Sequence, residues 1–132
     1  MEMHLSRNRI MKRFAVILGA CGVAIGAFGA HALRPILELT GRLATWDTGM
    51  FYFWIHTLAL FTIQFAYRPT DDSDGRHIAQ VSIIWIVSIL LFSGSLFALA
   101  LGAPGFIGAI TPIGGVGFIV GWLLLLRTVR QR

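Results

Sequence analysis

The residues of this sequence that could do chemistry are a small set of polar groups inside otherwise apolar stretches. Two are imidazoles, His31 and His56, and the rest are hydroxyl groups or backbone amides. Such groups can hydrogen-bond a small ligand or a lipid headgroup, and glycine amides at a helix start can hold an anion. The candidate ligand-binding residues are therefore His31, Tyr52, His56, Ser93, Ser95, Thr111, Gly114 and Gly115.

Specific enzyme chemistries fit these residues poorly. Ser93 or Ser95 with His56 would supply a nucleophile and a base, but the segment Phe92–Leu96 lacks the nucleophile-elbow pattern. The apolar stretches contain no carboxylate for proton coupling, and no three metal ligands are grouped. Haem held by two histidines needs them at one depth, whereas His31 and His56 are expected about 9 Å apart in depth. The sequence predicts a non-enzymatic protein without a metal or cofactor.

These polar groups belong to an unusually apolar chain. Of its 132 residues, 56% are hydrophobic and 13% are charged, whereas soluble domains average about 25% charged. Lys and Arg outnumber Asp and Glu by 11 to 6, but they flank apolar runs instead of forming one basic face, which argues against nucleic-acid binding. The composition indicates an integral membrane protein.

Four apolar stretches are long enough to cross a membrane as helices. At about 1.5 Å per residue, roughly twenty helical residues match a hydrocarbon core of about 30 Å. The uncharged run from 77 to 126 is too long for one crossing, and a turn signal at Gly102–Gly105 divides it. The prediction is an all-α, four-transmembrane-helix bundle within a membrane domain at 14–126, with spans near 14–33, 48–67, 78–101 and 106–126.

The basic residues predict the orientation of these spans. Nine of them lie in the N-terminal tail (1–13), the second connection and the C-terminal tail (127–132), whereas only Arg34 and Arg42 lie on the opposite side. Because cytoplasmic loops are enriched in Lys and Arg, we expect a bacterial inner (plasma) membrane protein with both termini in the cytoplasm. A signal peptide cleaved near Ala30–Ala32 is disfavoured, because the apolar run exceeds the usual length.

The first outer loop, 34–47, has two interpretations. Its apolar residues recur at helical spacing, at Ile36, Leu37, Thr40, Leu43 and Ala44. This pattern is typical of a short amphipathic helix on the outer membrane surface, with Trp46 as an interfacial anchor. The alternative is an ordinary loop.

Glycine stripes indicate close helix packing, because helices in lipid associate through small residues. The expected packing positions are Gly19, Gly22, Gly26, Gly29, Gly117 and Gly121. A second stripe lies roughly on the opposite side of the first span and consists of Ala20, Ala24, Ala27 and His31. Small residues on two faces predict that this helix lies between neighbours.

The last span is expected to begin at Thr111, as a cap, and Pro112, as its first helical residue. Residues 106–110 would then form a non-helical entry. The amides of Ile113, Gly114 and Gly115 would lie at a helix start with little side-chain cover, where an anion can bind.

The polar groups concentrate in the outer half of the expected bundle. His56 lies about 12 Å below the outer boundary at the helical rise, and Ser93 and Ser95 lie at a similar depth. A histidine within a span is costly and marks a functional site by default. The competing interpretation is structural, because Ser, Thr and His hydrogen bonds commonly hold membrane helices together.

Several short segments resemble a known family. They are Gly26–His31, Trp46–Gly49, His56–Leu60, Phe92–Leu96 and Thr111–Gly115, followed by Gly121-Trp122. Their order and spacing resemble the YgdD-like family of small inner-membrane proteins (domain of unknown function 423), whose eukaryotic relative is transmembrane protein 256. The resemblance runs from about Phe14 to Leu126 and implies a multi-pass membrane protein without an established activity. At position 97, where some members of the family have Tyr, this chain has Phe97 and therefore lacks one possible hydroxyl group.

The leading hypothesis is a multi-pass inner-membrane protein that binds a lipid headgroup, a small ligand or a partner helix through the outer polar cluster. Its expected partners are membrane lipids, with a homo-oligomer or a partner membrane protein as further options. The rival hypothesis is a small oligomeric permease or carrier, which would require a water-lined path past Gln64 to the cytoplasm.

Overall fold

The computed structural model describes residues 2–69 and 71–130, and every regular element in these ranges is helical. Residue 1 and residues 131–132 of the two expected tails lie outside the described residues. The rest of each tail continues a neighbouring helix. The elements are α1 (Glu2–Phe28), a π-helical turn (Gly29–Leu33), α2 (Arg34–Leu39), α3 (Leu43–Phe65), α4 (Asp72–Ala100), a 3-10 turn (Gly105–Ala109) and α5 (Thr111–Arg130).

Two glycines in the left-handed region end α2 and α4. Gly41 has φ +68° and Gly102 has φ +98°. After α2, Gly41 N–H donates to the Glu38 carbonyl and Arg42 N–H to the Leu37 carbonyl, which satisfies two of the last helical carbonyls. The expected amphipathic helix is therefore shorter than its apolar spacing suggests, because Gly41 breaks it and Leu43 begins α3.

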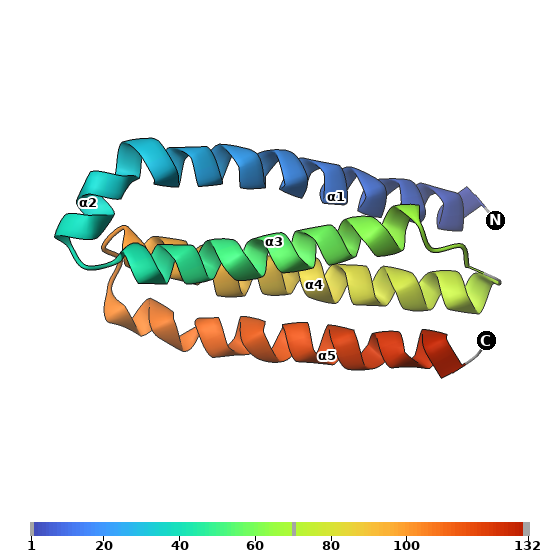
Figure 1. Cartoon of the computed structure of the whole chain (residues 1–132). Helices are drawn as coiled ribbons and strands as arrows, with labels where there is room; N and C mark the ends of the chain where they lie inside the picture. The colour runs from blue at the N-terminus through green and yellow to red at the C-terminus, as the bar shows by residue number, and fades with distance from the viewer. Residues whose placement is uncertain (1, 70, 131–132) are drawn as a thin grey trace.

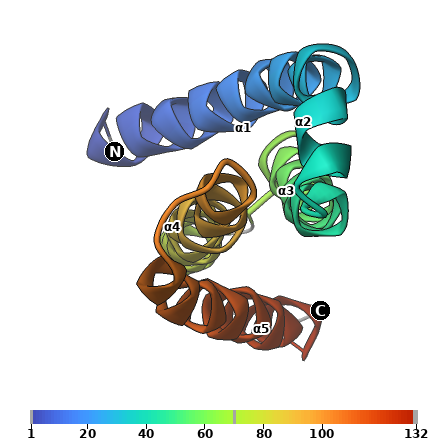
Figure 2. The same ribbon diagram turned by 90° about the vertical axis from the view of Figure 1, so that its left-hand side faces the viewer.

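The helix α4 lies at the centre of the fold. It packs against α1, α3 and α5, whereas α1 also packs against α3. Figure 1 shows four long helices running side by side, with both described chain ends at one end of the molecule and α2 at the other. Figure 2 shows α1 and α5 on opposite sides of the α3–α4 pair. The arrangement is open between α3 and α5, where side chains instead of backbones bridge the gap.

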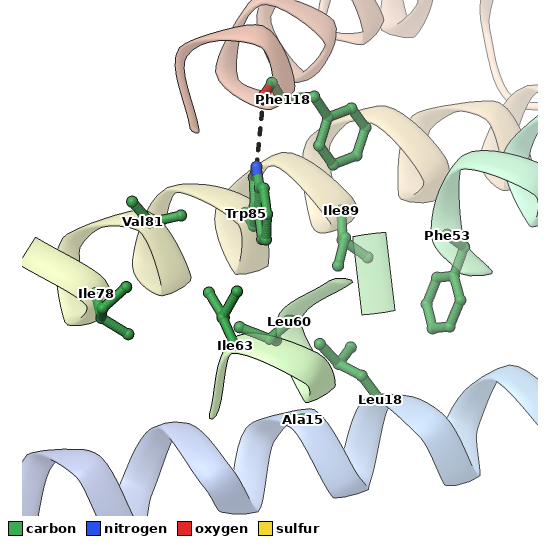
Figure 3. Packing of buried hydrophobic residues seen from close by; sticks show 10 residues of the cluster. All are labelled: Ala15, Leu18, Phe53, Leu60, Ile63, Ile78, Val81, Trp85, Ile89 and Phe118. Carbon is green, nitrogen blue, oxygen red and sulfur yellow. Dashed lines mark hydrogen bonds between the residues drawn. The ribbon is translucent and has the colours of Figure 1, made fainter. Parts of the chain in front are cut away.

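The core lies along α4, between α1, α3 and α5 (Figure 3). Leu60, Val81 and Trp85 are fully buried there, and Ala15 and Leu18 of α1 close one side. Trp85 Nε1–H points to the Phe118 carbonyl of α5, at an N···O distance of 3.4 Å. This packing fixes the positions of α3 and α5 relative to α4.

Three helical segments among the described residues are long and apolar enough to cross a membrane: Asn8–Leu39, Asp72–Ala100 and Gly105–Arg127. The helix α3 has 23 residues, so its length of about 34 Å also suffices. It contains Trp, Tyr, His, Thr and Gln and is not among the three segments that meet both the length and the hydropathy requirement. Length and composition therefore support α1, α4 and α5 as spans more directly than α3.

Glycines mark the closest helix contacts. Gly22, Gly26 and Gly29 face Phe53, Met50 and Trp46 of α3. On α5, Gly114, Gly117 and Gly121 face Phe92, Ser88 and Trp85 of α4, whereas a Cβ at Gly19 would meet nothing within 4 Å.

Two packing predictions are wrong. Gly19 does not mark a close helix contact. The second stripe, Ala20, Ala24, Ala27 and His31, is exposed. The reason is that α3 and α4 both cover the glycine side of α1, and no other described helix packs on its alanine side.

Candidate functional site

The centre of the site is His56, on the face of α3 that looks toward α5. Only 3% of its surface is exposed, and both of its ring nitrogens are engaged. Nδ1–H donates to the Tyr52 carbonyl at 2.9 Å, and Trp122 Nε1–H of α5 donates to Nε2 at 3.1 Å. A carbonyl can only accept and an indole N–H can only donate, so these partners define the neutral tautomer with the proton on Nδ1. Neither nitrogen is left to activate a nucleophile.

Aromatic rings surround this histidine. The Phe118 ring stacks on the imidazole with centroids 3.5 Å apart and planes 11° from parallel. The Trp122 ring contacts the Trp85 ring at 4.8 Å, and the Tyr52 ring contacts the Phe92 ring at 4.6 Å. Three helices therefore contribute rings to one cluster, which holds α3 and α5 together without backbone contact.

A groove with a volume of about 420 Å³ runs over this cluster between α3 and α5. Its floor includes His56 and Phe92, and Trp122 stands at its edge with 45% of its surface exposed. Its lining consists of Phe51, Tyr52, Ile55, His56, Phe92, Gly115, Phe118, Ile119 and Trp122. A concave, mostly apolar site with a few polar groups is typical of ligand pockets. We call it the α3–α5 groove.

The candidate hydroxyl residues lie beside this groove, at helix contacts. Ser95 Oγ and Thr111 Oγ1 are 2.6 Å apart and join α4 to the first turn of α5. The Ser95 hydroxyl also donates to the Phe92 carbonyl, at an O···O distance of 2.9 Å. Ser93 is fully buried, and its hydroxyl is among the buried polar atoms without a hydrogen-bond partner in the described part of the chain.

The structure does not bring all eight candidate residues together. Tyr52, His56 and Gly115 line the groove, whereas Ser93, Ser95 and Thr111 do not. His31 lies apart from them, exposed on the π-helical turn that follows α1.

Two predictions about the start of α5 are wrong. Residues 105–109 form a 3-10 turn instead of a non-helical entry. The amides of Ile113 and Gly114 both donate to the Ile110 carbonyl, at 3.1 and 3.3 Å, so they are not left open for an anion. A Cβ at Gly114 would lie 2.5 Å from the Phe92 backbone nitrogen, so this glycine serves the close contact between α4 and α5.

The prediction that Trp46 is an interfacial anchor is also wrong. The residue lies in the first turn of α3 and only 5% of it is exposed. Its ring packs on Phe97 of α4, with centroids 4.7 Å apart, and against Gly29 of the π-helical turn. The absence of a side chain at Gly29 creates the space, so the tryptophan joins three segments instead of facing the interface.

A second buried polar pair lies nearer the chain ends. Gln64 Nε2–H donates to Ser82 Oγ at 2.7 Å, and Ser82 in turn donates to the Ile78 carbonyl at 2.8 Å. Both residues are buried among apolar neighbours that include Leu60 and Val81. The pair joins α3 to α4.

Sequence reasoning missed Phe118 and Trp122 as site residues. Both lie four residues apart in α5, on the side that meets His56. A signal was present, because an indole N–H in a membrane span requires an acceptor. The sequence therefore indicated that Trp122 needs a hydrogen-bond acceptor at a similar depth on another span, and His56 is that acceptor.

The fold and site define a class: a small helical membrane protein with an aromatic groove. Residues 25–115 match the family described as "Protein of unknown function (DUF423)", so the chain belongs to that family. No solved structure matches the chain.

Relatives cover most of the chain. A UPF0382 membrane protein of Haemophilus influenzae is 44% identical and aligns over 78% of this chain and 79% of its own length. The UPF0382 membrane protein YwdK of Bacillus subtilis is 38% identical, over 88% and 94%. The UPF0382 inner membrane protein YgdD of Escherichia coli is 37% identical, over 90% and 88%. These names agree with a membrane location for this chain.

Proposed function

We propose that this protein is a non-enzymatic lipid-binding component of the bacterial inner membrane, in which the α3–α5 groove holds one apolar lipid chain. The observation that carries the proposal is the groove itself: a concave, aromatic-lined surface whose one imidazole is already satisfied by Tyr52 and Trp122. A site without open hydrogen-bonding groups on its floor favours an apolar occupant over a polar metabolite.

The shape of the groove suits a single extended chain. Its α5 wall runs for about two turns, from Gly115 to Trp122, or about 10 Å at the helical rise. Tyr52 lines the groove near its α2 end with 37% of its surface exposed, and in this proposal its hydroxyl meets the polar start of a lipid chain.

The proposal includes four spans with both termini in the cytoplasm. Support comes from the even number of long helices, from the two chain ends at one end of the molecule, and from the basic residues on that side. In this orientation the α3–α5 groove lies in the outer half of the bilayer. A C-terminal alkaline phosphatase fusion should be inactive and a C-terminal green fluorescent protein fusion should fluoresce; the reverse result would refute the orientation.

A carrier function receives less support. The part of α3 and α4 between the groove and the chain ends is packed with Leu60, Ile63, Val81 and Trp85. The polar groups there, Gln64 and Ser82, are hydrogen-bonded to each other.

Photocrosslinking tests the proposed occupant. The full chain would be reconstituted with phosphatidylethanolamine that carries a diazirine near the end of one acyl chain. We expect labelling to concentrate on Phe51, Ile55 and Ile119 and to be several-fold weaker on the exposed residues Val23 and Leu90. Equal labelling of both sets would refute the groove as a lipid site.

A pair of glycine variants supplies the matched control. Gly115→Leu should fill the groove and reduce its labelling several-fold, because Gly115 lines the groove and a Cβ there would make only ordinary contacts with the Phe92 ring, at 3.5 Å. Gly94→Leu adds the same side chain where nothing lies within 4 Å, and should leave labelling unchanged. If the Gly115 variant labels like the unchanged chain, no lipid chain occupies the groove.

A further inference from the structure

A second, polar groove lies where α4 begins and α5 ends. It has a volume of about 310 Å³ and is lined by Ser73, Asp74, Arg76, His77, Gln80 and Arg127. All of these except Arg127 come from the first turns of α4. This basic groove is separate from the α3–α5 groove, with which it shares no residue.

Two arginines from different helices face this groove. Arg76 belongs to α4 and Arg127 to α5, and both are exposed. His77 joins the two walls, because its Nε2–H donates to the Leu124 carbonyl of α5 at 2.8 Å. A direct contact therefore holds together the two helices that carry Arg76 and Arg127.

The one carboxylate in the lining is turned inward. Asp74 is 6% exposed, and the Tyr67 hydroxyl lies 3.0 and 2.8 Å from its two oxygens. The guanidinium groups are instead at the surface, so the accessible part of the groove is basic. Ser73 and Gln80 add neutral hydrogen-bond donors beside them.

We propose that the basic groove binds a phosphate group, namely that of an anionic phospholipid headgroup. Guanidinium groups recognise phosphate with paired hydrogen bonds, and basic pockets between membrane helices on the cytoplasmic side bind anionic headgroups. The assignment to the cytoplasmic leaflet rests on the orientation proposed above.

The surface next to the groove favours a lipid over free phosphate as the source of that group. On α4, Ile83 and Val87 follow Arg76 and Gln80 on one helical face, and both are about half exposed. On α5, Leu123 and Val120 continue the face of Arg127 in the same direction. A headgroup in the groove would thus have its acyl chains along exposed apolar side chains.

Native mass spectrometry of the full chain in detergent tests this site. The probes are phosphatidylglycerol, phosphatidylcholine with the same acyl chains, and inorganic phosphate. We expect preference for phosphatidylglycerol, and a loss of its affinity on the order of tenfold in the double variant Arg76→Gln/Arg127→Gln. The double variant Arg13→Gln/Arg34→Gln removes two exposed arginines elsewhere and should bind as the unchanged chain does.

Three results would overturn the proposal. One is unchanged phosphatidylglycerol binding by the groove variant at an unchanged unfolding midpoint, and another is an equal loss in the control variant, which would indicate diffuse attraction. Displacement of the lipid by inorganic phosphate at equal concentration would assign the site to free phosphate instead. Lipid binding in detergent does not depend on how the chain is oriented in the membrane. The fusion experiment therefore tests the proposed topology, and native mass spectrometry tests the basic groove independently of it.

Discussion

The two faces of α5 meet their neighbours in opposite ways. On the side that faces α4, the helix α5 carries Gly114, Gly117 and Gly121. Because these residues have no side chain, the backbones of α4 and α5 approach closely. Toward α3, Phe118 and Trp122 extend large rings, and a hydrogen bond and a ring stack span the gap. We refer to the first contact as the α4–α5 seam.

This difference shows how a groove can persist in a bilayer. Lipid tails do not drive helices together as water does, so close contact depends on small residues and on polar pairs. The α4–α5 seam uses both, through its glycines and through the Ser95–Thr111 pair. The α3–α5 contact uses only one polar pair, His56–Trp122, and rings that keep the helices apart.

The strongest test of the seam is Gly114→Ala. A Cβ there would lie 2.5 Å from the Phe92 backbone nitrogen, and backbone cannot move aside as a side chain can. We expect a loss of about 2 to 3 kcal/mol in unfolding free energy, measured by denaturant titration in detergent. Gly94→Ala is the matched control on the exposed face of α4 and should be neutral or stabilising by up to about 1 kcal/mol. Equal stability of the two variants would show that α4 and α5 are not closely packed.

A smaller effect is expected from Gly22→Ala, in the contact between α1 and α3. The new Cβ would meet ring atoms of Phe53 and Trp54 at 2.8 and 2.9 Å, and rings can shift. The expected loss is about 1 to 2 kcal/mol in the same titration. A loss as large as that of Gly114→Ala would mean that the α1–α3 contact is as rigid as the seam.

The His56–Trp122 hydrogen bond can be measured by a double-mutant cycle. The variants are His56→Phe, Trp122→Phe and the pair, which keep a ring at each position. We expect each single change to destabilise and a coupling energy of about 0.6 kcal/mol, with about 1.7 as the upper end for membrane proteins. Additive effects would show that the two side chains do not interact.

The smallest effect is expected from Gly115→Ala, one residue from the most sensitive position. Its Cβ would contact the Phe92 ring at 3.5 and 3.6 Å, which are ordinary distances. Because alanine favours helix over glycine, we expect a gain of up to about 1 kcal/mol in unfolding free energy. A clear loss would show that the groove side of α5 is as tightly packed as the seam.

The sequence predicted the helical class, the family and most of the glycine contacts, because apolar length and small-residue spacing are local properties. Depth along a helix could be counted, but rotation about its axis could not. His56 and Trp122 therefore could not be paired, since their contact depends on how α3 and α5 are turned around α4.

The wrong predictions have two different physical causes. Trp46 resembles an interfacial anchor by position, but Gly29, which is distant in the sequence, makes room to bury it. The amides of Ile113 and Gly114 resemble an anion site, but both donate to the carbonyl of Ile110, which directly precedes α5. The first error required the tertiary packing to correct it, whereas the second is a local hydrogen-bonding effect.

The polar residues of α3 have a consequence for how the chain is made. Gln64 finds its partner Ser82 in α4, and His56 finds Trp122 in α5. Both partners leave the ribosome after α3 does. Until α4 and α5 have been synthesised, Gln64 and His56 therefore each lack one hydrogen-bond partner. We expect the insertion of α3 into the bilayer to be coupled to the insertion of these later helices.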